Sequence, residues 1–316
     1  MSQQLREKVL ATLAMAKNTV FGQDEMLESI VASLVCEGHV LIEGMPGLGK
    51  TLAVSTLSKL CDLAFKRVQF TPDLLPSDLI GTMVYSQSKE EFSTKFGPLF
   101  TQILLADEIN RSPAKVQAAL LEAMAERQVT IGDNTYRLKE PFVVLATQNP
   151  IEQEGTYQLP EAQLDRFMMK VHVDYPQYEE EKKILTLKGE YHQELKALLH
   201  AQDFKQLKET IEAIYVDEKI KDMIVRIVHS TRPGNKHFVK EYDGAIVAGA
   251  SPRATIWLYK ISKYKAFLEG KDFVTPDHLL SIASNVLGHR MILSYEAQME
   301  KMSSREIAKK IATKAM

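Results

Sequence analysis

Residues 44–51 constrain the fold of this chain more strongly than any other segment. They are Gly44, Met45, Pro46, Gly47, Leu48, Gly49, Lys50 and Thr51, and they fit the pattern G-x-x-x-x-G-K-[ST]. The glycines let the backbone turn so that several N–H groups face one anion, and the helix expected from Thr51 points its positive end at the same place. Lys50 can then reach the β- and γ-phosphates of a nucleotide, and Thr51 can give a hydroxyl oxygen to Mg²⁺. The segment predicts a phosphate-binding loop between a strand and a helix.

The rest of the first half alternates apolar strands with helices. The expected strands are residues 39–43, 65–70, 103–107, 142–147 and 167–173, and the expected helices are residues 51–60 and 113–126. Such alternation is typical of an α/β fold with a parallel sheet flanked by helices. Two segments interrupt it at the sheet margin: a polar insert at about residues 81–97, and a predicted hairpin at about residues 129–138.

The second half, after Tyr175 and Pro176, is mostly helical. The expected helices are residues 178–191, 204–214, 218–230, 252–268, 276–287 and 303–312. We therefore place a domain boundary near residue 176, with a nucleotide-binding core over residues 1–175 and a helical domain over residues 176–316. From its pattern alone, the second domain is either a plain helical bundle or a lid.

Two acidic residues, Asp107 and Glu108, follow the apolar run 103–106. Ligands of α/β proteins bind at the carboxyl ends of strands, so we expect Asp107 to hold Mg²⁺ through water. Glu108 should point elsewhere and be free to polarise the attacking water. Asn149 follows the strand at residues 142–147 and precedes Pro150. It is either a turn residue or an amide that orients the same water.

Two arginines have roles that the residues alone leave open. Arg166 follows Asp165 just before the last expected strand, where it is either a surface ion-pair partner or an arginine finger for the γ-phosphate of a neighbouring subunit. Arg253 lies in the first turn of a helix that has Ser251 as its N-cap and Pro252 as its first residue. An arginine there opposes the helix dipole, which indicates either a salt bridge or a role beyond local stability.

Taken in chain order, these segments resemble a known family. The matching segments are Phe21-Gly22-Gln23 and residues 44–51, 105–111, 117–124, 146–150, 159–167 and 249–253. Together they resemble the MoxR family of AAA+ ATPases from about residue 20 to residue 287. The resemblance implies a P-loop AAA+ core with a C-terminal all-helical lid domain, a hexameric ring, and ATP between subunits.

By resemblance, Gly22 and Gln23 border the adenine pocket, and Asn149 is the first sensor. Arg166 is the finger given to the neighbour, and Arg253 is the second sensor, carried on the lid. The insert matches one that interrupts the second helix of the family, and the hairpin matches one that precedes the first sensor. The expected nucleotide contacts are Gly22, Gln23, residues 44–51 and Leu52.

The resemblance also implies an activity, which is Mg²⁺-dependent hydrolysis of ATP at the subunit interfaces. The expected catalytic residues are Lys50, Glu108, Asn149, Arg166 and Arg253, and the expected metal residues are Thr51 and Asp107. Arg111 is expected to reach toward the interface.

Members of the family are thought to act as chaperones. They assemble or activate client protein complexes, often with metal or cofactor insertion and often with a von Willebrand factor A-type partner. The sequence names no client. Two alternatives stay open: a nucleic-acid remodelling motor of the helicase-related AAA+ type, and an ATP-binding scaffold with little turnover.

Amino-acid composition limits which partners the protein can bind and which cellular compartment it fits. The chain has 39 Lys and Arg against 41 Asp and Glu, so it lacks the basic surplus typical of a protein that binds mainly nucleic-acid phosphates. Its two cysteines fit a reducing compartment. No apolar stretch approaches the length of a membrane span, and Leu5, Val9, Leu13 and Ala16 predict an amphipathic helix rather than a cleaved signal. We expect a cytoplasmic protein with no membrane insertion.

Overall fold

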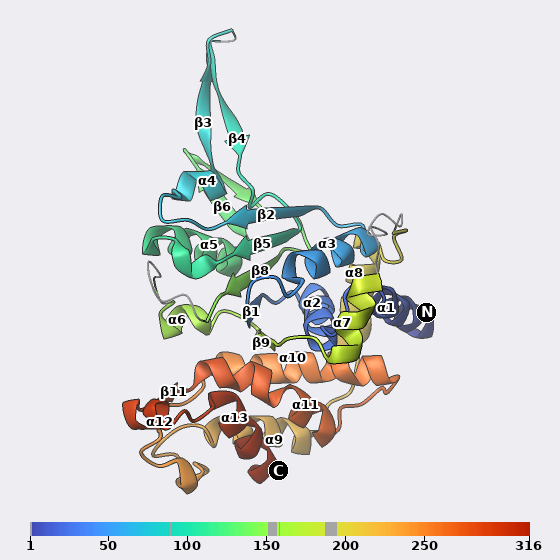
Figure 1. Ribbon diagram of the computed structural model, residues 1–316, viewed down its shortest axis with the longest axis vertical. Helices are drawn as coiled ribbons and strands as arrows, with labels where there is room; N and C mark the ends of the chain where they lie inside the picture. The colour runs from blue at the N-terminus through green and yellow to red at the C-terminus, as the bar shows by residue number, and fades with distance from the viewer. Residues whose placement is uncertain (1, 89, 151–156, 158, 187–194) are drawn as a thin grey trace. The chain divides into compact units, whose positions relative to one another are not determined.

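The computed structural model describes residues 2–88, 90–150, 157, 159–186 and 195–316 (Figure 1). The chain forms two compact units, and each unit is built from separate stretches of sequence. The core unit comprises residues 11–159 and 171–204, and the helical unit comprises residues 1–10, 160–170 and 205–316. The sequence predicted a single domain boundary near residue 176. That boundary remains a prediction, because each observed unit combines separate stretches of the chain.

A five-stranded sheet with the order β2-β5-β8-β1-β9 forms the centre of the core unit. Its strands are β1 (Val40–Gly44), β2 (Phe65–Gln69), β5 (Ile103–Asp107), β8 (Val143–Gln148) and β9 (Met169–Val173). β2 pairs with β5, β5 with β8, and β8 with β1, all in parallel. β1, β5 and β8 are almost entirely buried, which explains their continuous apolar sequences. The predicted α/β fold with a parallel sheet is confirmed.

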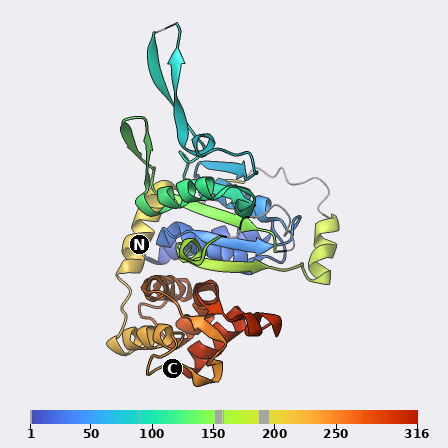
Figure 2. The same cartoon turned by 90° about the vertical axis from the view of Figure 1, so that its left-hand side faces the viewer.

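Helices cover this sheet. α2 (Asp24–Cys36), α3 (Lys50–Leu60) and α5 (Ala114–Glu126) lie around it in Figures 1 and 2. They bury aliphatic side chains at helical spacing, such as Leu27, Val31 and Leu34 of α2. The other helical elements up to residue 212 are α4 (Pro76–Ile80), η1 (Ile109–Arg111), α6 (Glu161–Leu164), α7 (Tyr178–Thr186) and α8 (Ala201–Glu212). The expected helix at residues 178–191 is present to Thr186, and residues 187–191 lie outside the described residues.

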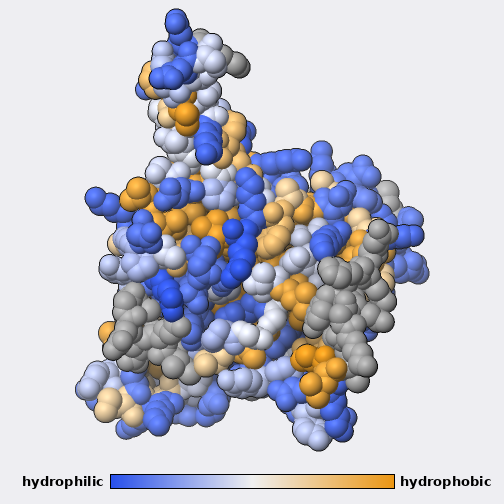
Figure 3. Space-filling view, turned by 45° about the horizontal axis from the view of Figure 1, so that its top comes forward, coloured by the Kyte–Doolittle hydropathy of each residue, from blue (hydrophilic) through white to orange (hydrophobic). Residues whose placement is uncertain are grey.

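The two interruptions of the alternation are antiparallel hairpins. The insert at residues 81–97 contains β3 (Gly81–Ser86) paired with β4 (Glu91–Phe96), and the second hairpin pairs β6 (Gln128–Ile131) with β7 (Asn134–Arg137). The sequence indicated only that the insert is polar. The β3–β4 hairpin nevertheless exposes the apolar side chains of Tyr85 and Phe92, and hydrophobic patches are visible on this projection in Figure 3. At its base, the rings of Phe96 and Tyr136 meet at 5.0 Å, which joins the two hairpins.

The helical unit contains most of the C-terminal half of the chain. Its helices beyond residue 212 are α9 (Glu218–His229), α10 (Pro252–Glu269), α11 (Pro276–Leu287), α12 (Tyr295–Met299) and α13 (Ser304–Lys314), with η2 (Lys240–Tyr242) and η3 (Gly288–Arg290). β10 (Ile246–Ala248) and β11 (Ile292–Leu293) add a small antiparallel ribbon that the sequence did not indicate. Ser251 caps α10 as predicted, since its side chain accepts a hydrogen bond from the backbone N–H of Arg253.

The N-terminal helix α1 (Ser2–Lys17) buries the face that the sequence predicted, comprising Leu5, Val9, Leu13 and Ala16. Its exposed positions are mixed, since Leu10 and Met15 reach solvent together with polar side chains such as Gln3 and Glu7. Within the described ranges, no helix has the length and apolar character needed to cross a membrane.

His39, the residue before β1, ties the sheet to α5. Its Nδ1 accepts a hydrogen bond from the backbone N–H of Val144 at 3.0 Å, and its Nε2 donates to the carbonyl oxygen of Met124 at 3.2 Å. The side chain is buried, and burial lowers the pKa of His39 to about 4. The ring is therefore neutral at physiological pH, with its proton on Nε2.

The stability of the fold should therefore depend on pH through His39. An unfolded histidine has a pKa of about 6.5, so as the pH falls the unfolded state takes up the proton first. The stabilisation linked to His39 is complete above about pH 6.5 and is lost as the pH falls toward 4. We expect the free energy of unfolding to drop by about 2 kcal/mol between pH 7.5 and pH 5 because of this residue.

Urea unfolding of the wild type and of His39→Gln at the two pH values measures this contribution. A glutamine can keep both hydrogen bonds and does not titrate, so the variant should lose this part of the pH dependence. His200→Gln, at an exposed histidine, is the matched control and should behave like the wild type. Equal pH dependence in the wild type and in His39→Gln would contradict the assignment.

Candidate nucleotide-binding site

The loop between β1 and α3 has the backbone that an anion site requires. β1 ends at Gly44 and α3 begins at Lys50, so the positive end of α3 faces the loop. Gly47 and Gly49 have φ values of 85° and 77°, which residues with a Cβ rarely adopt. A Cβ on Gly44 would lie 2.7 Å from the carbonyl oxygen of Val173 in β9, so no larger residue fits there.

Lys50 lies across this loop. Its Nζ donates a hydrogen bond to the carbonyl oxygen of Gly44 at 2.6 Å. Partial burial lowers the pKa of Lys50, and the negative charges of Asp107 and Glu108 act in the opposite direction. The lysine thus brings a cation to the loop, close enough to the two carboxylates at the end of β5 to interact with their charge.

Asp107, the last residue of β5, is held by two donors. Its Oδ1 accepts a hydrogen bond from the hydroxyl of Thr147 in β8 at 2.5 Å, and its Oδ2 accepts from Arg67 in β2 at 2.6 Å. These contacts follow from the sheet order, because β5 lies between β2 and β8. The sequence predicted the place of Asp107 at the strand end but gave no signal for Arg67 or Thr147.

Glu108 is more constrained than the sequence suggested. The prediction was that its side chain is free to polarise water. Instead, its Oε2 accepts a hydrogen bond from Gln69 at 2.6 Å and lies 3.1 Å from Nε of Arg111. Its backbone has a φ of 57°, a conformation that costs a non-glycine residue energy and is often found at functional sites. Arg111, which the resemblance aimed at a subunit interface, pairs with this carboxylate within the chain.

Two hollows meet over the loop. The first has a volume of about 380 Å³ and is lined by Pro46, Gly47, Gly49, Lys50, Thr51, Leu52, Arg67, Gln69, Asp107, Glu108 and Asn149. The second has a volume of about 340 Å³ and is lined by Thr19, Val20, Phe21, Pro46, Gly47, Leu48, Gly49, Leu52, Tyr175, Pro176, Glu181 and Ile184. The first is rich in charged and polar groups, and the second is largely apolar. Their shared floor suits a ligand with an anionic end and a flat apolar end, as a nucleotide has.

Gly22 and Gln23 lie beside the second hollow and support its wall. The side chain of Gln23 is buried and donates a hydrogen bond to the carbonyl oxygen of Asp174 at 3.1 Å, next to Tyr175 and Pro176. Gly22 has a φ of 72°, and a Cβ there would come within 3.0 Å of Pro176. Phe21, which lines the hollow, directly precedes Gly22 and Gln23 in the chain and belongs to the same family motif.

Asn149 lines the first hollow and is buried, whereas Arg166 and Arg253 belong to the helical unit. Arg253 pairs with Asp165 at 3.1 Å, which explains how an arginine is tolerated in the first turn of α10. Asp165 is thus paired with Arg253 rather than with its neighbour Arg166. The Nε of Arg166 is buried and finds no hydrogen-bond partner among the described residues.

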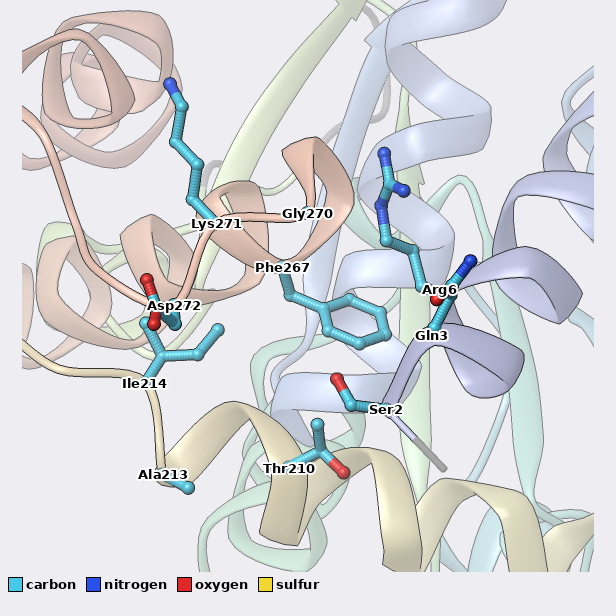
Figure 4. Close-up of a pocket in the computed structure, with 10 residues that line it drawn as sticks. All are labelled: Ser2, Gln3, Arg6, Thr210, Ala213, Ile214, Phe267, Gly270, Lys271 and Asp272. Atoms are coloured by element: carbon cyan, nitrogen blue, oxygen red, sulfur yellow. The ribbon is translucent and has the colours of Figure 1, made fainter.

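A further hollow of about 610 Å³ lies within the helical unit between the ends of α1, α8 and α10 (Figure 4). In the figure, the ring of Phe267 projects between these elements, with Ser2 and Arg6 beside it. Arg6 donates a hydrogen bond to the carbonyl oxygen of Leu268 near the end of α10. None of the predicted nucleotide residues lines this hollow, and the loop geometry of an anion site is found in the core unit instead.

The donor set of the first hollow fits Mg²⁺ shared with a nucleotide. Mg²⁺ prefers oxygen ligands and is usually held by one or two protein groups together with phosphates and water. Thr51 and Asp107 offer such oxygens on its wall. Across the part of the chain that the structure describes, no group of three or more His, Cys, Asp or Glu residues could hold a metal by itself.

Comparison with known proteins agrees with this geometry. Residues 39–169 match the model of the ATPase family associated with various cellular activities (AAA), and residues 242–311 match the AAA lid domain. The chaperone MoxR1 of Mycobacterium tuberculosis is 43% identical over 93% of this chain and 78% of its own length. The chain belongs to the MoxR family of AAA+ ATPases.

Two further relatives support the family assignment. The protein YeaC of Bacillus subtilis is 44% identical over 89% of this chain and 86% of its own length. A crystal structure of a candidate ATPase from Cytophaga hutchinsonii superposes with a TM-score of 0.92 at 45% identity, covering 99% of this chain and 96% of that chain. The predicted AAA+ core and helical lid are therefore confirmed as the architecture of this MoxR-family chain.

The contact between Arg67 and Asp107 makes a prediction about metal binding. Arg67 is half-exposed and occupies an oxygen that a metal would use, so Arg67→Met should remove a competing cation. We expect the Mg²⁺ concentration that half-saturates nucleotide binding to fall by about two- to five-fold, the effect of one exposed ion pair. Titrating Mg²⁺ while a fluorescent nucleotide binds measures this.

Lys66→Met is the matched control, because neighbouring residues of a strand point to opposite faces of a sheet. Its Mg²⁺ requirement should equal that of the wild type. An unchanged or increased requirement in Arg67→Met would contradict the competition.

Proposed function

We propose that this chain hydrolyses ATP with Mg²⁺ at the interfaces of a ring of like subunits, and that the resulting motion assembles or activates client protein complexes. The observation that carries the proposal is that Lys50, Asp107 and Glu108 line one hollow over the loop. A cation, a metal ligand and a general base within one site are the parts that phosphoryl transfer to water requires.

Each residue of the site has a role in this proposal. Lys50 binds the β- and γ-phosphates, and backbone N–H groups of residues 44–51 bind the same anion. Thr51 and Asp107 hold Mg²⁺, which when bound neutralises charge on the phosphates. Glu108 polarises the water at its carboxylate, and Asn149 orients that water. The apolar hollow beside Phe21 and Leu48 takes the adenine.

Two arginines have the remaining roles. Arg166 would act as the finger for the neighbour's γ-phosphate, and Arg253 would sense a γ-phosphate from the lid, either that of its own subunit or that of the neighbour. The Nε of Arg166 is buried and has no hydrogen-bond partner within the described residues, so no hydrogen bond of that atom ties the side chain down there. We infer a hexamer in the cytoplasm, with a von Willebrand factor A-type protein as a candidate partner for client recognition.

Glu108→Gln should abolish turnover and keep nucleotide binding. Removing a general base typically costs about 10²- to 10⁴-fold in rate, and glutamine can still accept the hydrogen bond of Gln69. ATPase rate per subunit, measured against protein concentration with light scattering for mass, is the test. For the wild type, the rate should rise as rings form.

Glu122→Gln, at an exposed position of α5, is the control and should hydrolyse ATP normally. A turnover of Glu108→Gln equal to that of the wild type would refute the site. Negligible wild-type turnover at every assembly state would instead favour the ATP-binding scaffold.

A mixing experiment tests the finger. Arg166→Ala should lose about 10³-fold in rate, and so should Lys50→Ala, the first for lack of a finger and the second for lack of phosphate binding. Mixed rings should regain activity, because a Lys50→Ala subunit still offers Arg166 to the intact site of its neighbour. If the mixture is as inactive as each variant alone while rings still form, Arg166 does not act between subunits.

A further inference from the structure

The residue before the proposed finger, Asp165, lies at the centre of a charged cluster within the helical unit. Its Oδ1 accepts hydrogen bonds from the hydroxyl of Ser251 at 2.7 Å and from Nε of Arg290 at 3.0 Å. Its Oδ2 accepts a hydrogen bond from Arg253 at 3.1 Å. One carboxylate thus joins α10, η3 and the segment that contains Arg166.

Arg290 fixes this carboxylate in place. Its side chain is almost fully buried and also donates to the backbone carbonyl oxygens of Asp165, Phe167, Met168 and Val286. His289 lies within hydrogen-bonding distance of the carbonyl oxygen of Phe167 as well. The segment at residues 160–170 is therefore fastened to the helical unit, and Arg166 belongs to the same compact unit as Arg253.

Arg253 is held more loosely than Arg290. Its side chain is 50% exposed, against 1% for Arg290. Within the described chain, its guanidinium makes one side-chain contact, to Asp165. It is thus a cation that can leave its partner, whereas Arg290 is one that cannot.

We propose that Asp165 is a positioning residue that holds Arg253 when no γ-phosphate is bound, and that the γ-phosphate must take Arg253 from it. The inference rests on the proposed function, in which Arg253 contacts that phosphate. A guanidinium pairs with a carboxylate or a phosphate through the same N–H groups, so the two anions compete for it. The position of Arg253 therefore reports whether a triphosphate or a diphosphate is present.

The competition makes a specific prediction about nucleotide discrimination. Asp165→Asn removes the negative charge that holds Arg253, so a larger fraction of molecules has this arginine ready for the γ-phosphate. We expect the affinity for ATPγS to rise about three- to ten-fold, and the affinity for ADP, which has no γ-phosphate, to stay unchanged. Equilibrium binding of both nucleotides to the full chain, with Mg²⁺ and at a fixed protein concentration, measures the ratio.

The control is the same substitution in an Arg253→Ala background. There the ratio of the two affinities should not respond to Asp165→Asn, because the arginine for which both anions compete is gone. A structural effect of the substitution would change ADP and ATPγS binding together, and would persist without Arg253. Either result would overturn the proposal.

A second variant covers the case in which Asp165→Asn does not fold because Arg290 is left as a buried charge without its carboxylate. The pair Asp165→Asn and Arg290→Gln removes both charges and should raise the ATPγS-to-ADP affinity ratio in the same way. If the wild type binds both nucleotides normally and a folded variant shows an unchanged ratio, the role of Asp165 is refuted and the proposed function is not. Wild-type protein that binds neither nucleotide would refute the proposed function itself.

Discussion

Parallel pairing of β1, β5 and β8 is the constraint on which the whole site depends. The register aligns Leu41 with Ala146 and Leu105 with Leu145, so the three strands end at one edge of the sheet. That edge carries the loop after Gly44 and the carboxylate of Asp107. Because both faces of these strands are buried, a register slip would expose apolar side chains to water. The packing of the core thereby fixes the spacing of the candidate catalytic groups.

Each of the three carboxylates with a proposed role has a cationic partner among the described residues. Asp107 is paired with Arg67, Glu108 with Arg111, and Asp165 with Arg253. The pairing keeps the charges compensated without a nucleotide, since an isolated charge in a partly buried site is costly. Under the proposed function, a nucleotide with its metal would bring both signs of charge and would have to exchange with these pairs. Binding would then require side-chain rearrangement at each pair that it displaces.

The local parts of this molecule could be predicted well. The phosphate loop, the strands and the amphipathic α1 follow from short patterns whose physics lies within a few residues, and the structure has all of them within one or two positions. The small β10–β11 ribbon was not predicted, because Ile246–Ala248 is a short irregular run that pairs only with a strand more than forty residues later. The insert was expected to be polar, and no pattern in the sequence indicated the contact at its base, where Phe96 meets Tyr136 of the other hairpin.

The sequence by itself determined which candidate groups this chain carries: a lysine and a threonine on a glycine loop, an acidic pair after a buried strand, and two arginines in the second half. Only the tertiary structure decided what those groups touch. Gln69 meets Glu108 because β2 pairs with β5, and Asp165 meets Arg253 and Arg290 across 88 and 125 residues of chain. Local periodicity reports which face of a strand or helix is buried, but it contains no information about which distant charge will neutralise a given carboxylate. That choice is made by the order of the strands and by the packing of the helices.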